Sequence, residues 1–335
     1  MPITQIDTRT EDLTLTIVAE FPVPLAQLWD AYADPRKIER FWGPPEYPAT
    51  FTRHDMVAGG HSHYYMTGPD GDTPGGYWEF VAVDAPHSFE VRDGFADAEG
   101  NPNTELPSMR MVFSFEETAD GSRLTTTTHF NSEEELSQLL EMGMLEGTKA
   151  AMGQIDTVLA DLESFAAGRA TEAQLLSDTR VRVSRVIRGD VEQVWRAHHE
   201  AALLQRWQLG PDGWTMPVCE PPAEVGGTYR FEWESDDGEN RFGFTGEVLE
   251  SQPPHREVTT ERMVGGDQVA DGVNDEQWTS VVNEMTLTPV SGGTLLSLLI
   301  TYPSQEVRDA ILATGMTNGM EDSYARLERE VLSPA

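Results

Sequence analysis

Histidines are the first candidates for chemistry in this chain, because an imidazole can ligate a metal or transfer a proton near neutral pH. His61 and His63 lie two residues apart and could share a metal ion if both were accessible on one face of a strand. His54-Asp55 precedes them and could act as an acid or base at a pocket mouth, although an exposed loop pair is the simpler interpretation. The sequence has no nucleophile elbow, phosphate-cradling glycine loop or zincin helix. Catalytic residues therefore stay unassigned, and we expect no metal and no cofactor.

The cysteine content and the length of the apolar segments indicate where in the cell the protein is located. A single cysteine, Cys219, excludes an intrachain disulfide and a cysteine-rich metal site. No stretch has the roughly 18 consecutive apolar residues of a membrane-spanning helix, and no secretory signal is visible at the N-terminus. These features predict a cytoplasmic protein that does not insert into membranes.

The net charge is −34, with 57 acidic residues and only two lysines, Lys37 and Lys149. Such a field repels nucleic acid, whose binding requires a basic surface, so no nucleic-acid partner is expected. The acidity indicates either a protein partner with a basic face or simply a solubilising surface. The sequence does not choose between these two.

An internal repeat organises the chain, because pairs of residues recur about 165 to 172 positions apart. A unit of this size can close its own hydrophobic core. We therefore predict one domain over residues 8–164, a linker or helix extension over 165–177, and a second domain over 178–333. The recurring pairs are Leu28-Trp29 with Val194-Trp195, Phe41-Trp42 with Arg206-Trp207, Gly59-Gly60 with Gly226-Gly227, Pro86-His87 with Pro254-His255, and Gly143-Met144 with Gly315-Met316.

The same elements are expected in each repeat. A first strand (Leu13 to Phe21, or Arg180 to Ile187) is followed by two short helices and then by strands as far as about residue 130 or 302. A long helix closes the repeat. Its apolar residues in the first copy recur every three or four positions: Met144, Thr148, Met152, Ile155, Leu159 and Leu162.

Alternation within the strands predicts which side chains face inward. In the second repeat, Tyr229, Phe231 and Trp233 alternate with charged or polar residues, which places the aromatic side chains in the interior. Aligning Gly60 with Gly227 carries this phase to the first repeat, where Ser62, Tyr64 and Met66 should point inward. His61 and His63 then point to solvent, which disfavours the metal site. Two further strands alternate in the same way in both repeats, with inward residues Met111, Phe113 and Phe115, Leu124, Thr126, Thr128 and Phe130, Asn283, Met285 and Leu287, and Leu296, Leu298, Ile300 and Tyr302.

The order of these elements resembles the heat-shock protein 90 ATPase activator-like family, part of the START-like, helix-grip (SRPBCC) superfamily. The resemblance covers both repeats. It rests on Leu28-Trp29, Phe41-Trp42-Gly43-Pro44, Gly59-Gly60, Gly68-Pro69-Asp70-Gly71 and Asp84-Ala85-Pro86, and on Val194-Trp195, Arg206-Trp207, Val225-Gly226-Gly227, Gly246-Glu247-Val248-Leu249-Glu250 and Gln252-Pro253-Pro254.

This resemblance implies an α+β fold of two tandem helix-grip domains. In each, a curved antiparallel sheet wraps around a long C-terminal helix, with two short helices after the first strand and a cavity between sheet and helix. Many family members carry a Gly-Trp pair in the final helix, where this chain has Gly147-Thr148 and Gly319-Met320. The change should enlarge that end of the interior. The co-chaperone's client-binding module has no counterpart here, so chaperone activation is not the expected activity.

Aromatic and methionine side chains would suit apolar or flat ligands. Each could equally be ordinary core. Bulkier residues in the second repeat suggest a more filled interior, so we expect the first domain to be the better binder. The candidate lining residues are Trp42, Tyr64, Met66, Met111, Phe113, Met144, Thr148 and Met152 in the first repeat, and Trp207, Tyr229, Phe231, Trp233, Met285, Leu298, Met316 and Met320 in the second.

Three functions stay open at this point. The chain could bind or sequester a small hydrophobic molecule, act as a cyclase- or hydrolase-type enzyme on a hydrophobic metabolite, or serve as a protein-interaction or stress module through its acidic surface. The first is the preferred hypothesis. The fold does not choose among them, because one scaffold can host unrelated functions.

Overall fold

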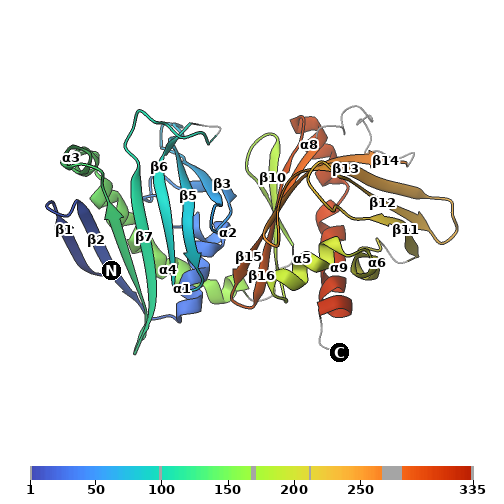
Figure 1. Cartoon of the computed structure of the whole chain (residues 1–335), viewed down its shortest axis with the longest axis horizontal. Helices are drawn as coiled ribbons and strands as arrows, with labels where there is room; N and C mark the ends of the chain where they lie inside the picture. The colour runs from blue at the N-terminus through green and yellow to red at the C-terminus, as the bar shows by residue number, and fades with distance from the viewer. Residues whose placement is uncertain (1, 98–99, 167–170, 211–212, 266–280, 333–335) are drawn as a thin grey trace. The chain divides into compact units, whose positions relative to one another are not determined.

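The computed structural model describes residues 2–97, 100–166, 171–210, 213–265 and 281–332, without the side chains of 156 and 160–166. The chain divides into two compact units, residues 1–168 and 169–335. In chain order the first unit contains β1 (Ile3–Arg9), β2 (Thr14–Phe21), α1 (Leu25–Ala33), α2 (Pro35–Ile38), β3 (Ala49–His54), β4 (His61–Met66), β5 (Gly75–Asp84), β6 (Ser88–Ala96), β7 (Met109–Thr118), β8 (Gly121–His129), α3 (Glu133–Glu141) and α4 (Met144–Ala166) (Figure 1).

The second unit repeats this order, which confirms the α+β tandem fold. Its elements are β9 (Glu172–Leu175), β10 (Arg180–Ile187), α5 (Val191–His199), α6 (Ala201–Trp207), β11 (Trp214–Glu220), β12 (Thr228–Ser235), β13 (Arg241–Gln252), β14 (Arg256–Val264), β15 (Val281–Val290), β16 (Gly293–Thr301), α8 (Gln305–Ala313), α9 (Met316–Leu327) and a π-helical turn, η1 (Glu328–Leu332) (Figure 1).

Within the residues that the structure describes, each unit has one eight-stranded sheet in which neighbouring strands run antiparallel. The strand orders are β1-β2-β8-β7-β6-β5-β4-β3 and β11-β12-β13-β14-β15-β16-β10-β9. The sheets therefore begin earlier than the expected domain starts at residues 8 and 178. The extra strands β1 and β9 pair with the first strand of each repeat, and their short exposed sequences carry little apolar alternation.

The strand phases match the alternation in the sequence. Met111, Phe113 and Phe115 of β7 are buried, and so are the even-numbered residues of β8 from Leu124 to Thr128. In β12 the aromatic residues face the interior, but Glu232 on the opposite face is also buried, contrary to the simple assignment of charge to water. Arg230 and Arg241 cover this carboxylate and form ion pairs with it.

The long closing helix that the sequence predicts from Met144 onward is α4 in the first unit, and a separate helix, α3, precedes it. In the second unit α8 precedes α9 in the same way. In the first unit α3 starts at the N-cap Ser132, whose hydroxyl accepts a hydrogen bond from the Glu135 amide. Gly143 then adopts a φ of +86°, and its counterpart Gly315 a φ of +78°, so the chain turns before α4 and α9 begin. Met152, Ile155 and Leu159 of α4 are buried as expected. The side chain of Leu162 lies outside the described part.

The interior of the first unit is largely aromatic. The rings of Phe89 and Phe113 stack with 4.4 Å between centroids, and Trp29 of α1 meets Phe115 edge-on at 5.3 Å. Trp78 at the centre is completely buried. Such ring pairs stabilise a core beyond the burial of their area. Helix α1 is thereby held against the same sheet face that α4 covers.

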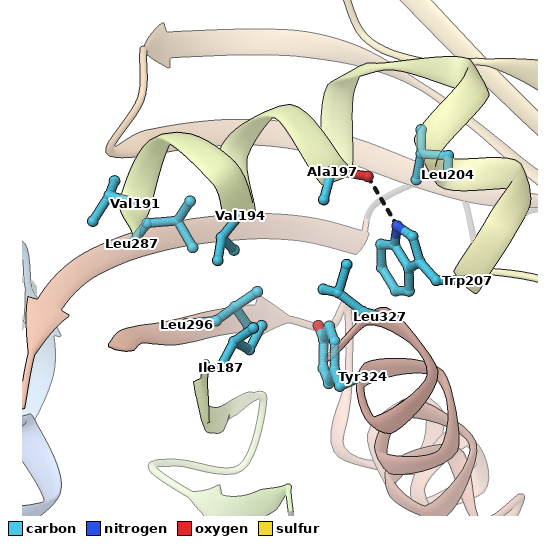
Figure 2. Packing of buried hydrophobic residues seen from close by; sticks show 10 residues of the cluster. All are labelled: Ile187, Val191, Val194, Ala197, Leu204, Trp207, Leu287, Leu296, Tyr324 and Leu327. Carbon is cyan, nitrogen blue, oxygen red and sulfur yellow. Dashed lines mark hydrogen bonds between the residues drawn. The ribbon is translucent and has the colours of Figure 1, made fainter. Parts of the chain in front are cut away.

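Aliphatic residues replace many of these rings in the second unit. Figure 2 shows one cluster, in which the ring of Trp207 lies beside Tyr324 and Leu327 of α9. Val194, Leu287 and Leu296 belong to the same cluster on the other side of Leu327. The indole N–H of Trp207 donates to the Ala197 carbonyl at 2.9 Å. Trp207 is therefore satisfied within the core by α5, the helix that precedes its own.

We predict that Gly143→Ala lowers the free energy of unfolding by about 1 kcal/mol, because a residue with a Cβ is strained at this left-handed φ. Gly147→Ala is the matched control in α4. No heavy atom lies within 4 Å of a Cβ added there, so this change should stabilise the protein by about 0.5–1 kcal/mol. Urea unfolding measures both values, and equal effects would contradict the assigned helix break.

Candidate functional site

A cavity of about 220 Å³ lies between the sheet and α4 in the first unit. Helix α4 contributes Met144, Thr148 and Met152, one turn apart, while strands contribute residues such as Tyr64 and Met111. All eight residues proposed from the first repeat lie along this cavity. The full lining is Tyr32, Phe41, Trp42, Pro44, Tyr64, Met66, Asp93, Met109, Met111, Phe113, Thr126, Met144, Gly147, Thr148, Ala151, Met152 and Ile155.

Gly147 and Thr148 explain why space is left at this end of α4. Gly147 has no side chain, and an added Cβ would meet nothing within 4 Å. Thr148 is small, and its hydroxyl donates to the Met144 carbonyl at 2.8 Å. That hydroxyl is thus engaged by its own helix.

Nine of the lining residues were not proposed from the sequence, and Asp93 of β6 is the acidic one among them. Its Oδ1 accepts hydrogen bonds from the Trp78 indole N–H at 2.7 Å and from the Tyr64 hydroxyl at 3.4 Å. Burial raises the pKa of Asp93 to about 7, although these two hydrogen bonds favour its ionised form. The carboxyl group can therefore hold or release a proton near neutral pH.

Two further polar atoms in this cavity are buried without a hydrogen-bond partner in the described part of the chain. They are the indole Nε1 of Trp42, whose nearest hydrogen-bonding neighbour is the Tyr64 hydroxyl, and the hydroxyl oxygen of Thr126. Trp42 packs edge-on against Trp78, with 4.6 Å between ring centroids. Buried donors generally need partners, so these atoms offer hydrogen bonds to a molecule in the cavity.

The second unit has a smaller cavity, of about 160 Å³, as its bulkier side chains predict. Five of the eight residues proposed from the second repeat line it: Tyr229, Phe231, Trp233, Met285 and Leu298. The other three do not. Trp207 belongs to the core of Figure 2, Met320 packs against two hydrophobic clusters, and Met316 against one of them. The apolar stripe of α9 is thus core in this unit.

Polar residues make up much of the second cavity's wall. His198 and His199 of α5, Glu257 and Glu261 of β14, and Asn283 of β15 all line it. Burial raises the pKa of Glu261 to about 7, with Asn283 and Tyr229 as its hydrogen-bonding neighbours. Burial also lowers the pKa of His198 to about 4. Neither histidine was proposed from the sequence, because the apolar pattern of α5 gave no sign of a pocket.

Asp93 and Glu261 occupy corresponding positions. Both lie seven residues after the aligned Pro86 and Pro254, on the corresponding strands β6 and β14. The signal was present in the sequence as a carboxylate at the same place in both repeats. A single carboxylate within a strand forms no motif by its spacing, so the sequence pattern alone does not single it out.

His54, His61 and His63, the histidines that the sequence singled out, do not line either cavity. His61 and His63 lie on β4, with 6.3 Å between ring centroids, on the face opposite the cavity-lining Tyr64. His54 and Asp55 are buried, so the expected exposed loop pair is wrong. The ring nitrogens of His54 lie 2.8 Å from the Ser62 hydroxyl and 2.8 Å from the Tyr32 carbonyl. Within the described ranges, no three His, Cys, Asp or Glu residues cluster as a metal site would require.

An antiparallel sheet, a closing helix and a cavity against the sheet define each unit as a START-like, helix-grip domain. The chain matches the family described as activator of Hsp90 ATPase homolog 1-like protein over residues 22–160 and 188–331. It belongs to this family and carries the family's domain twice. Among curated proteins, none matches this chain. In the described residues, no helix is long and apolar enough to cross a membrane.

Several solved structures are similar to about half of the chain. Protein Ms6760 from Mycobacterium smegmatis is 49% identical over 47% of this chain and 97% of its own, with a TM-score of 0.45. A protein from Arthrobacter aurescens is 43% identical over 47% of this chain and 91% of its own, with a TM-score of 0.45. A protein from Rhodobacter sphaeroides is 31% identical over 48% and 95%, with a TM-score of 0.41.

The raised pKa of Asp93 predicts a specific pH dependence of stability. An unfolded aspartate ionises near pH 4, so folding favours the protonated form, and this contribution is lost as pH rises through about 7. Asp93→Asn should therefore gain stability relative to the natural protein between pH 5 and pH 8, by about 2–3 kcal/mol.

Denaturant unfolding at both pH values measures this difference. Asp70→Asn is the control, because Asp70 lies exposed in a turn. Its stability relative to the natural protein should not change with pH. An Asp93→Asn variant that behaves like this control would show that Asp93 is ionised in the folded protein at pH 5.

Proposed function

We propose that the cavity of the first unit binds a small, largely apolar molecule of one or two rings that carries a hydrogen-bond acceptor. The observation that supports this most directly is an aromatic and methionine-lined cavity that contains buried, unpartnered hydrogen-bond donors. A fully packed core would leave neither the space nor these donors.

The cavity volume sets the size of the ligand. An apolar cavity of about 150 Å³ is large enough for benzene, and most drug-sized ligands occupy about 300 Å³ or more. At about 220 Å³, the first cavity suits a molecule between these limits. Methionines such as Met66, Met111 and Met152 can adjust their rotamers to different ring shapes.

The polar atoms set the ligand's functional group. Trp42 Nε1–H and the Thr126 hydroxyl can both donate to a carbonyl or phenolic oxygen. The protonated form of Asp93 can also donate, and its ionised form can accept from a phenol. A phenol or an aromatic ketone would satisfy these groups, whereas a pure hydrocarbon would leave them unpaired.

A proton-transfer enzyme is the second candidate, favoured by the pKa of Asp93 near 7. A buried carboxyl with this pKa can act as a general acid or base on a ligand held beside it. The variant Asp93→Asn distinguishes a carrier from an enzyme. A carrier should retain affinity for its ligand within a few fold, whereas an enzyme should keep its affinity and lose turnover by roughly 100-fold or more.

Binding is tested first by native mass spectrometry of the freshly purified protein and then by titration with 2-naphthol. Thr148→Trp should weaken 2-naphthol binding roughly tenfold or more, because the indole would occupy space that the ligand needs. Glu146→Trp is the matched control on the same helix. Its natural side chain is 77% exposed and does not line the cavity, so the added tryptophan should leave binding unchanged.

Two results would contradict the proposal. One is 2-naphthol binding that is equally strong in the natural protein and in Thr148→Trp. The other is a purified protein without bound mass that also fails to take up 2-naphthol or a mixed extract of aromatic metabolites. Circular dichroism of each variant distinguishes loss of the cavity from loss of the fold.

A further inference from the structure

The second cavity differs in chemistry from the first and does not depend on the function proposed above. Its walls combine aromatic rings with carboxyl groups: Tyr229, Phe231, Trp233 and Phe244 lie along it together with Glu257 and Glu261. No lysine or arginine belongs to its described lining. An aromatic wall beside a carboxylate attracts a cation through both the ring faces and the negative charge.

The unpartnered polar atoms point to the same kind of ligand. His198 Nδ1 lies 2.7 Å from the Val194 carbonyl, so this nitrogen carries the proton and Nε2 is an acceptor. His198 Nε2 and Asn283 Oδ1 are both buried without a hydrogen-bond partner in the described residues. Two buried acceptors without donors suit a ligand that donates a hydrogen bond to each of them.

Other polar groups of the wall are already engaged. His199 is placed between the Trp195 carbonyl and Glu257, at 2.8 Å and 3.2 Å. The Tyr229 hydroxyl donates to the Thr260 carbonyl at 2.9 Å, and the Trp233 indole donates to the Gln208 carbonyl at 2.6 Å. The acceptors of His198 and Asn283 and the carboxyl of Glu261 are therefore the groups that a ligand can use.

The first cavity makes the contrast clear. Tyr32 takes the position of His198 in the first repeat. The unpartnered buried atoms of the first cavity belong to Trp42 and Thr126, and both can donate a hydrogen bond. The corresponding Trp207 donates to Ala197 and so offers nothing to a ligand. One fold thus presents donors in the first unit and acceptors in the second.

We propose that the second cavity is a binding site for a small organic cation, a primary ammonium on a compact apolar group. An ammonium has three donors and no acceptor, which matches Glu261, His198 Nε2 and Asn283 Oδ1. The cavity volume of about 160 Å³ limits the apolar part to about the size of one benzene ring. The net charge of −34 raises the local concentration of cations around the whole chain.

Titration with benzylammonium chloride at pH 8 tests this site, with benzyl alcohol as the neutral probe of similar shape. We expect benzylammonium to bind with a Kd below about 1 mM, and benzyl alcohol roughly tenfold more weakly or not at all. Glu261→Gln should weaken benzylammonium binding roughly tenfold or more. Asp93→Asn, the corresponding change in the first unit, should leave it unchanged.

Nitrogen-15 spectra locate the ligand even if Glu261→Gln fails to fold. The Trp233 indole lies in the second cavity and the Trp42 indole in the first, so each reports on one unit. Benzylammonium should shift the Trp233 indole signal and leave that of Trp42 in place. Single Trp→Phe variants assign the two signals.

The affinity should also rise between pH 6 and pH 8, because the pKa of Glu261 is about 7 and only its ionised form attracts the ammonium. The groups around Glu261 are Glu257 on its own strand, Tyr229 on β12, Asn283 on β15, Tyr302 after β16, and His198 and His199 on α5. Of these, Tyr229 and Tyr302 have pKa values raised by burial, and the pKa of His198 is about 4, so these three stay neutral across this range.

The site is overturned by any of three results. Benzyl alcohol could bind as tightly as benzylammonium, the Trp42 signal could shift while that of Trp233 does not, or no saturable shift could occur up to about 10 mM benzylammonium. Loss of binding in Asp93→Asn but not in Glu261→Gln would assign the ammonium to the first cavity instead. None of these results bears on 2-naphthol binding in the first unit, so the two proposals fail separately.

Discussion

Each unit depends on one packing constraint: an antiparallel sheet with an apolar face has to be covered, and the closing helix provides the cover. The size of the side chains at corresponding positions of that helix decides where a cavity is left in each unit. In the first unit Gly147 and Thr148 are too small to reach the sheet, and a cavity lies directly against α4. In the second unit Met320 takes the place of Thr148 and packs into two hydrophobic clusters. The space left there lies against α5 instead, which is why histidines of α5 line it.

The large aromatic side chain of one pair of neighbouring strands lies on a different strand in each unit. Ser62 of β4 pairs with Trp78 of β5, whereas at the corresponding places Tyr229 of β12 pairs with Gly246 of β13. A Cβ added at Gly246 would lie 2.7 Å from the Tyr229 ring and 1.8 Å from the Thr260 carbonyl oxygen, so only glycine fits beside this tyrosine. Each pair therefore contains one large ring, but the polar atom of that ring lies at a different place in the two units. As a result the buried acid of the first unit accepts from an indole, and that of the second unit has Asn283 as a partner.

A carboxyl group at the same place in both interiors is costly, because burial disfavours its charge. The pKa of both Asp93 and Glu261 is raised to about 7, so neither carboxyl is fully ionised at neutral pH. Their surroundings then give the two cavities opposite hydrogen-bonding character. Trp42 and Thr126 leave unpaired groups that can donate in the first, and His198 and Asn283 leave unpaired acceptors in the second. A tandem chain can in this way present two different sites on one scaffold.

The sequence by itself determined the repeat, the order of elements and the inward faces of the strands, and it named eight residues that lie along the first cavity. These follow from local patterns: alternation in strands, three-and-four spacing in helices, and glycines at corresponding turns. Tertiary structure decided the rest. Strands β1 and β9 form only because a neighbour pairs with them, and α3 is a separate helix because the chain turns at Gly143 before α4 begins. Whether Met320 is core or cavity wall, and whether His54 is exposed or buried, depends on which distant side chains fill the space around them. Such contacts between residues far apart in the chain leave no periodic trace in the sequence, because packing volume belongs to the whole interior and to no single segment.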